Sequence, residues 1–212
     1  MKRRHVNVPY ALLDLKEANE TKYTLVAILS FRSKRSKRIK VSLSKITEVT
    51  GLKGRQLTNH INKLVEHGMI SRSKIKYSSG EYSCNTYTIL CNEEYFAEIP
   101  WEIACSDTLS VWDKIGYCIM KRFTDLDKRD FICYLTKEEL VKHLQCSPNQ
   151  VDKVKRNLKK AGLIEFERNS NKITLVYEHS LEETPSNNKT EIKKAIGKKN
   201  KVRKNENHSN TF

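Results

Sequence analysis

Residues 51–70 read GLKGRQLTNHINKLVEHGMI, and the spacing of their apolar side chains decides the fold. Leu57, Ile61 and Leu64 recur every three to four residues, which places them on one face of a helix. The opposite face carries hydrogen-bond donors and no acid: Arg55, Gln56, Asn59, Asn62 and Lys63. We therefore predict an amphipathic helix with one buried face and one polar, basic face.

The segments around this helix complete a known order of elements. Residues 43–50 predict a shorter helix, and Gly51 with its neighbour Leu52 predicts the turn between the two helices. Two strand-like runs follow, 70–77 and 82–90, on either side of a Ser-Ser-Gly turn signal. Helix, turn, helix and hairpin is the order of a helix-turn-helix with a wing.

The second part of the chain repeats this plan. Residues 151–164, VDKVKRNLKKAGLI, align without a gap on 57–70, LTNHINKLVEHGMI. Upstream, Thr136 begins a capping box, Ser147 is placed to cap the next helix, and Pro148 suits its first position. A shorter hairpin is predicted after Gly162, with strands at 164–166 and 173–177. The polar positions matching those of the first helix are Ser147, Asn149, Gln150, Lys153, Arg156 and Asn157.

We accordingly predict an α+β, mainly helical fold of two similar domains, residues 1–90 and 91–180. A short apolar segment ending in Pro begins each half: VNVP at 6–9 and FAEIP at 96–100. Residues 181–212 are rich in Lys, Asn, Glu and Ser, and their few bulky groups are too widely spaced to form a core. We expect this stretch to be a disordered basic tail.

The net charge of +15 is unevenly distributed. Residues 1–90 hold 18 Lys and Arg against 6 Asp and Glu, which gives +12. Residues 91–180 hold 14 against 15 (−1), and residues 181–212 hold 8 against 4 (+4). General solubility does not require nearly all of the excess in one half, so we predict a polyanionic partner for the first part.

Composition also bounds the class of protein. No apolar run approaches the roughly 20 residues of a membrane span, and no signal-peptide core follows the charged start. The six cysteines lack metal-site spacing, which favours reduced thiols and no metal. No catalytic constellation and no cofactor motif is found, so we expect a cytoplasmic protein that is not an enzyme.

These features resemble tandem winged helix-turn-helix DNA-binding proteins. The resemblance rests on the motif Leu57-x6-Leu64-x3-Gly68-Met69-Ile70 and on the matching stretch from Val151 to Ile164. The Pro-terminated segments and the helix containing TLVAILSF add to it. The order is similar to replication initiators and replisome organisers of phages, plasmids and other mobile elements. The resemblance implies double-stranded DNA as the partner.

Within such a domain the second helix would enter the major groove. Arg55 suits guanine, and Gln56 and Asn59 suit adenine, with Asn62 on the same face. Lys53 and Lys63 flank this face and are predicted to contact phosphates. The hairpin residues Arg72, Lys74 and Lys76 alternate along one strand, so they should share a face and reach the DNA backbone or the minor groove. The basic loop 32–40 is expected to be solvated, with added phosphate contacts.

The second domain has two open interpretations. Its residues Ser147, Asn149, Gln150, Lys153 and Arg156 can read bases, but acids surround them, including Asp125, Asp127 and Asp130 in one loop. Either this half binds DNA only when the first half holds it there, or it is a surface for dimerisation or for replication or transcription proteins.

Replication of a mobile element is the favoured role, because two joined readers suit repeated origin sites. Two alternatives remain from the sequence. A transcription repressor would use the same contacts at a promoter, and a protein-interaction module would bind a partner without DNA.

Overall fold

The structure is a computed structural model that describes residues 5–33, 36–76, 82–124, 131–167 and 171–176, with only the backbone at 75, 76, 82 and 83. The predicted tail, the turn at 78–80 and the acidic loop with Asp125, Asp127 and Asp130 lie outside these residues. Within them the protein is α+β, with eight helices and three small sheets. None of the helices in this part of the chain has the length and apolar character that crossing a membrane requires.

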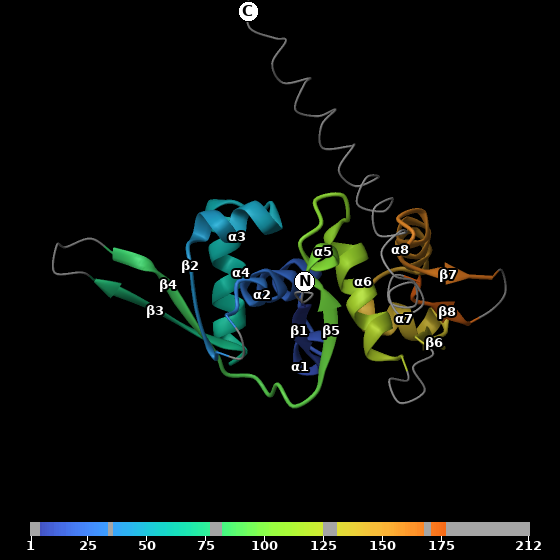
Figure 1. Ribbon diagram of the computed structural model, residues 1–212, viewed down its shortest axis with the longest axis horizontal. Coiled ribbons are helices and arrows are strands. Elements are labelled where there is room, and N and C mark those ends of the chain that lie inside the picture. Colours follow the sequence, from blue (N-terminus) through green and yellow to red (C-terminus); the bar gives the residue numbers. More distant parts are fainter. Residues whose placement is uncertain (1–4, 34–35, 77–81, 125–130, 168–170, 177–212) are drawn as a thin grey trace, which may run out of the picture.

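The same order of elements occurs twice along the chain (Figure 1). The first half contains β1 (His5–Pro9), α1 (Tyr10–Leu13), α2 (Asn19–Ser30), β2 (Arg38–Val41), α3 (Leu43–Thr50), α4 (Gly54–Glu66), β3 (Ile70–Lys76) and β4 (Tyr82–Ile89). The second half contains β5 (Phe96–Pro100), α5 (Trp101–Ala104), α6 (Val111–Arg122), β6 (Ile132–Cys133), α7 (Lys137–Leu144), α8 (Pro148–Lys160), β7 (Glu165–Phe166) and β8 (Ile173–Thr174).

Local sequence signals explain the helix pair α3–α4. The Ser42 hydroxyl oxygen accepts a hydrogen bond from the backbone N–H of Lys45 and caps α3. Gly51 ends α3 in the left-handed region with a φ of +73°, which a glycine adopts without steric cost. Leu57, Ile61 and Leu64 are all buried, so the predicted apolar face of α4 is confirmed.

The matching pair α7–α8 also follows its sequence signals. Thr136 and Glu139 form the predicted capping box at the start of α7. The Ser147 hydroxyl accepts from the N–H of Gln150 and caps α8, with Pro148 as its first residue. These predicted caps are confirmed. The buried face of α8 consists of Val151, Val154 and Leu158.

A three-stranded antiparallel sheet accompanies each helix pair. The strand orders are β2-β4-β3 and β6-β8-β7, so the last strand lies in the centre both times. Three strand predictions need correction. β2 begins at Arg38, within the predicted basic loop, because it pairs from Arg38 to Val41 with β4. The strands predicted at 164–166 and 173–177 shorten to two residues each, paired through only Glu165↔Thr174 and Phe166↔Ile173.

Helix α2 is buried on every side. All residues from Thr21 to Ser30 are buried, including Lys22 and Thr24. The reason is its position: α2 packs on α3 and α4 of its own half and on α6 of the other half. It is therefore the central element of the molecule.

Strand β1 pairs with β5, and this two-stranded ribbon joins the halves (Figure 1). The pairing is antiparallel, with His5 opposite Pro100, Asn7 opposite Glu98 and Pro9 opposite Phe96. Val8 of β1 and Ala97 and Ile99 of β5 have buried side chains. The core is consequently continuous across the two halves.

Candidate nucleic-acid interface

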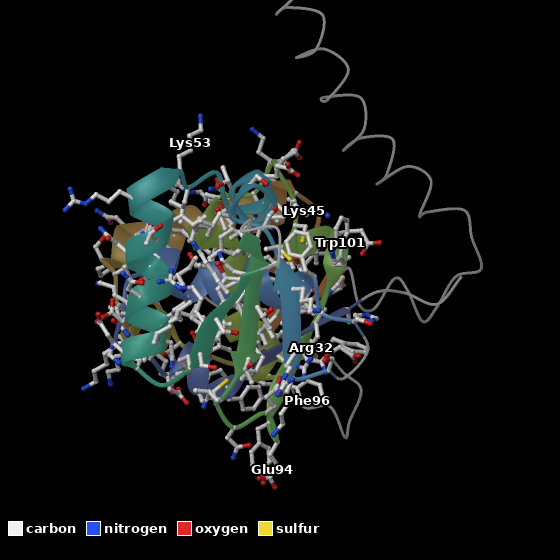
Figure 2. All side chains as sticks on the ribbon, turned by 90° about the vertical axis from the view of Figure 1, so that its left-hand side faces the viewer. Arg32, Lys45, Lys53, Glu94, Phe96 and Trp101 are labelled. Atoms are coloured by element: carbon white, nitrogen blue, oxygen red, sulfur yellow. The ribbon has the colours of Figure 1, made fainter. Side chains whose placement is uncertain are left out.

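The outer face of α4 is polar and solvent-exposed. Arg55, Gln56, Asn59 and Asn62 are all exposed on it. Apart from Glu66, its last residue, α4 contains no acid. Lys53 precedes the helix and is also exposed, and Figure 2 shows it at one end of α4. The structure thus brings the predicted base-reading side chains together on one accessible surface.

Lys63, near the end of α4, has a partner within the protein. Its ammonium donates to Glu17 across 2.7 Å, and His67 Nε2 lies 3.1 Å from the other oxygen of the same carboxylate. The hydrogen bond from Lys63, followed by that from His67, lowers the pKa of Glu17 to about 2. Sequence reasoning missed this cluster, because Glu17 is 46 positions from Lys63.

Basic side chains also lie on the β3–β4 hairpin beside α4. Arg72 and Lys74 are exposed and stand opposite Tyr87 and Asn85 of β4. Directly opposed residues share a face, so these two cations extend the face on which Tyr87 is buried. The pairing is irregular between Lys74 and Lys76. The regular alternation predicted for all three residues therefore holds for Arg72 and Lys74 and is interrupted before Lys76.

The corresponding face of α8 is less available. Asn149, Lys153 and Arg156 are exposed and Gln150 is half-buried. Ser147 uses its hydroxyl oxygen as the helix cap, and Arg156 Nε donates to the carbonyl of Asp152. These contacts occupy part of the hydrogen-bonding capacity that the sequence offered for a ligand.

Two further polar side chains near α8, Asn157 and Lys137, bind carboxylates of the second half. The amide of Asn157 donates to the Asp113 carboxylate at 3.2 Å, so this predicted position points back onto α6. Lys137 forms an ion pair of 2.7 Å with Asp152, in the second turn of α8. The exposed face of α4 carries no such acid in its first turns.

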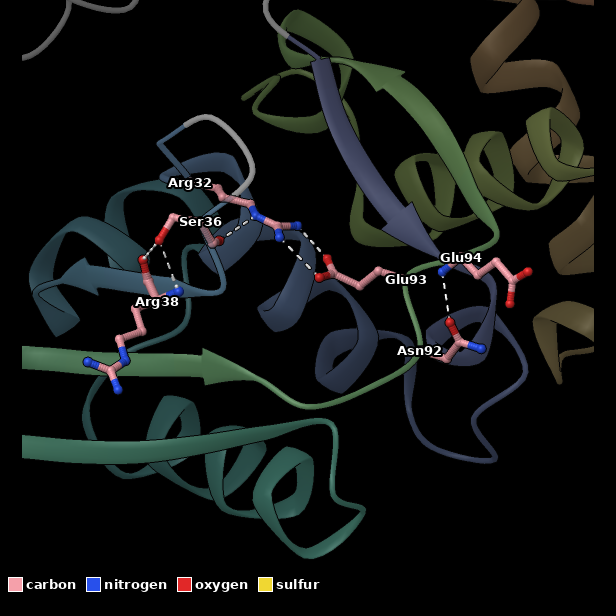
Figure 3. A network of polar contacts seen from close by, with 6 residues as sticks. All are labelled: Arg32, Ser36, Arg38, Asn92, Glu93 and Glu94. Carbon is pink, nitrogen blue, oxygen red and sulfur yellow. Dashed lines mark hydrogen bonds and ion pairs between the residues drawn. The ribbon is translucent and has the colours of Figure 1, made fainter.

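At the start of the basic loop, Arg32 binds Glu93 within the protein (Figure 3). Arg32 donates to both carboxylate oxygens of Glu93, at 3.0 Å for Nη2 to Oε2, and its Nε donates to the Ser36 carbonyl at 2.7 Å. Glu93 belongs to the segment that leads from β4 to β5. Arg32 therefore fixes the segment that connects the two halves. Lys37, Arg38 and Lys40 of the same loop are exposed.

The cysteines in the described residues are free thiols in varied surroundings. Burial raises the pKa of Cys118 to about 12 and that of Cys133 to about 11. Thiols with such pKa values stay protonated near neutral pH, so they are poor nucleophiles and poor metal ligands.

Together, these features define a chain with two matching helix–hairpin units, one of which presents a basic polar surface. Comparison with protein families places it more closely. The family model described as replication initiator protein A (RepA) N-terminus matches residues 84–194, just over half of the chain. The chain belongs to this family. Neither the curated proteins nor the solved structures gave a significant match.

Proposed function

We propose that this protein initiates replication of a plasmid or similar mobile element by binding double-stranded DNA through two winged-helix domains, residues 1–90 and 91–180. One observation carries the proposal: Arg55, Gln56, Asn59 and Asn62 form an exposed face of α4 in the strongly basic half. The family relationship supports the replication role.

Helix α4 is proposed to lie in the major groove. There Arg55 can donate two hydrogen bonds to a guanine, and Gln56 or Asn59 can pair with an adenine. Each such pair discriminates against a wrong base by about 1–3 kcal/mol. Lys53, at the start of the helix, and Lys63 near its end are placed for phosphates, with Lys63 first having to exchange its contact with Glu17.

The hairpin supplies the contacts that do not depend on sequence. Arg72 and Lys74 project from β3 into solvent, and Lys76 follows on the same strand. Each phosphate that these cations neutralise releases counterions, which strengthens binding at low salt. The first half thus combines base readout with electrostatic attraction.

The second half is proposed to add a weaker contact through Asn149, Gln150, Lys153 and Arg156. The family match lies over this half, although the first half has the greater positive charge. Because the halves share one core, contact by the first half holds α8 close to the same DNA molecule.

The test is selection of bound sequences from random DNA duplexes by the full chain at physiological salt. We expect an enriched motif, and Arg55→Ala should erase one position of it. Lys160→Ala, an exposed charge change on α8 outside the proposed contacts, is the matched control and should leave the motif unchanged. Failure to enrich any motif, or a motif that Arg55→Ala leaves intact, contradicts the proposal.

The genomic position of the motif then separates the possible roles. Repeated sites at the element's own origin support initiation. A single site at a promoter identifies a repressor instead. Binding to a protein that persists at high salt without DNA identifies an interaction module.

A further inference from the structure

The two halves meet as the two subunits of a symmetric dimer would. In the β1–β5 ribbon His5 corresponds to Phe96 and Pro9 to Pro100, yet His5 pairs with Pro100 and Pro9 with Phe96. Corresponding residues are thus exchanged across a centre at Asn7 and Glu98. This register is that of a twofold axis, and in an antiparallel pair such an axis is perpendicular to the ribbon.

The contacts between helices around the ribbon follow the same twofold relation. α2 packs on its counterpart α6, while α1 contacts α6 and α5 contacts α2. In Figure 1, counterparts lie diagonally opposite each other: α3 is at the upper left and α7 at the lower right, and the two hairpins point to opposite ends. The view in this figure is therefore close to the direction of the axis.

Two buried lysines at matching positions repeat the relation in the interior. Lys22 donates to the carbonyl of Leu13, the last residue of α1, at 3.2 Å. Lys114 donates to the Tyr23 hydroxyl at 2.6 Å, which in turn donates to the carbonyl of Ala104, the last residue of α5. In each half the last carbonyl of the short helix is therefore bound by a lysine of α2 or α6, directly in α1 and through the Tyr23 hydroxyl in α5.

The connection between the halves is fixed. Glu93 is held by Arg32, and the N–H of Tyr10 donates to the carbonyl of Tyr95 at 3.0 Å. Across the interface Asn19 donates to the carbonyl of Leu144, and Gln145 donates to that of Leu15. With a shared core and these contacts, α4 and α8 keep one separation and one relative orientation.

The axis also places the two helices on one side of the molecule. In Figure 2 the viewing direction of Figure 1 runs horizontally, and α4 lies along the left edge, with its sheet to the right. A twofold rotation about this direction carries α4 to the position of α8 at the same level. Both polar faces are thus available to a single DNA duplex.

We infer that the protein binds one DNA site composed of two half-sites in inverted orientation at a fixed spacing, read by α4 and α8 as in a fused dimer. This inference rests on the proposed function, since it describes the DNA that the same helices recognise. A twofold axis reverses the direction in which the second helix meets the duplex, so the half-sites are inverted.

The half-sites also differ in sequence. Gln56 and Gln150 occupy matching positions, but Arg55 corresponds to Asn149, Asn59 to Lys153 and Asn62 to Arg156. The two helices therefore share at most one contact type. The site is an imperfect inverted repeat, in which the half read by α4 dominates because its surroundings are more basic.

The experiment uses the full chain and duplexes built from the selected motif. Four arrangements are compared: inverted half-sites, the same half-sites as a direct repeat, inverted half-sites with about 5 added base pairs (half a turn), and the α4 half-site alone. We expect the original inverted site to bind roughly 10²-fold more tightly than the other three, since only it engages both helices.

The outcomes separate this inference from the function beneath it. Specific binding that is equal for inverted and direct repeats, that tolerates the 5 added base pairs, or that needs one half-site only, overturns the inference and leaves DNA reading by α4 in place. Absence of specific binding to every duplex overturns the proposed function itself.

Discussion

The first and second halves of the chain have the same elements in the same order but present different surfaces. The buried face of α4 holds Leu57, Ile61 and Leu64, and that of α8 holds Val151, Val154 and Leu158. The first and last residues of the two sets align, and the middle one is shifted by one position. The exposed faces of the two helices share little beyond one glutamine. The difference teaches that apolar spacing specifies the fold, while the exposed positions are free to diverge in function.

The hairpins differ more than the helices. β3 and β4 span 7 and 8 residues, whereas β7 and β8 have 2 each. Arg72 on β3 corresponds to Phe166 on β7. The Phe166 ring is covered by the ammonium groups of Lys155 and Lys159, at 4.4 and 4.8 Å from its centre. Lys155 and Lys159 therefore pack on this ring, while Arg72 extends into solvent.

The buried lysines offer the largest expected effect. Burial lowers the pKa of Lys114 from 10.5 to about 8. Protonation thus disfavours the folded state, and the free energy of unfolding should rise between pH 8 and 10.5 by about 3 kcal/mol from this group. Lys114→Met should remove that rise, measured by denaturant unfolding across this pH range.

Two variants complete the comparison. Lys22→Met should flatten the curve in the same direction, because burial also lowers the pKa of Lys22. Lys160→Met, at an exposed site, should leave it unchanged. A pH dependence that persists in full in Lys114→Met would show that this ammonium is hydrated in the folded protein.

A close approach of two helices in the second half gives the next effect. A Cβ added at Gly116 would lie 2.6 Å from Cγ1 of Val154, a stiff β-branched side chain. The first half holds Thr24 at the matching position. Gly116→Ala should lower the free energy of unfolding by about 1–3 kcal/mol, which outweighs the gain in helix propensity.

The double-mutant cycle with Val154→Ala identifies the cause. In the Val154→Ala background the added methyl group has room, so Gly116→Ala should cost less there. An equal cost in both backgrounds would mean that the contact with Val154 is not responsible.

Helix capping distinguishes the halves by a smaller amount. α8 is capped by Ser147, whereas Lys53 at the start of α4 makes no side-chain cap. Ser147→Ala should lower the free energy of unfolding by about 1 kcal/mol, and Lys53→Ala should leave it nearly unchanged. Thermal and denaturant unfolding of both variants provide the measurement. Equal losses would contradict the assigned difference.

The smallest effect concerns a single charge on the first hairpin. Arg72→Ala should reduce the slope of log affinity against log salt by about 0.9 for specific and random duplexes alike, because one phosphate contact is lost. Lys160→Ala removes a charge from the second half and should leave the slope unchanged. Equal slopes for all three proteins would remove β3 from the proposed interface.

Residue patterns predicted much of this architecture, because they record local preferences. The spacing of Leu57, Ile61 and Leu64 located α4, and the hydroxyls of Thr136 and Ser147 located the starts of α7 and α8. These signals act within a few residues. The exposed face of α4 could be predicted for the same reason, since it lies opposite the apolar face.

Contacts between distant residues were not predictable from such patterns. The pairing of β1 with β5 and the burial of Lys22 depend on how the halves meet, which periodicity does not encode. Glu17 and Lys63 are 46 positions apart, and Arg32 and Glu93 are 61 apart. Cations that looked available in the sequence proved to have partners for this reason.

The matched glutamines give the most direct test of the claim that the first half is the main DNA reader. Gln56→Ala and Gln150→Ala make the same change at matching positions of α4 and α8. The measurement is the affinity ratio of the full chain for its selected duplex over a random duplex. We predict that Gln56→Ala lowers this ratio by about tenfold or more, and that Gln150→Ala lowers it less. Equal losses, or a larger loss for Gln150→Ala, would contradict the account.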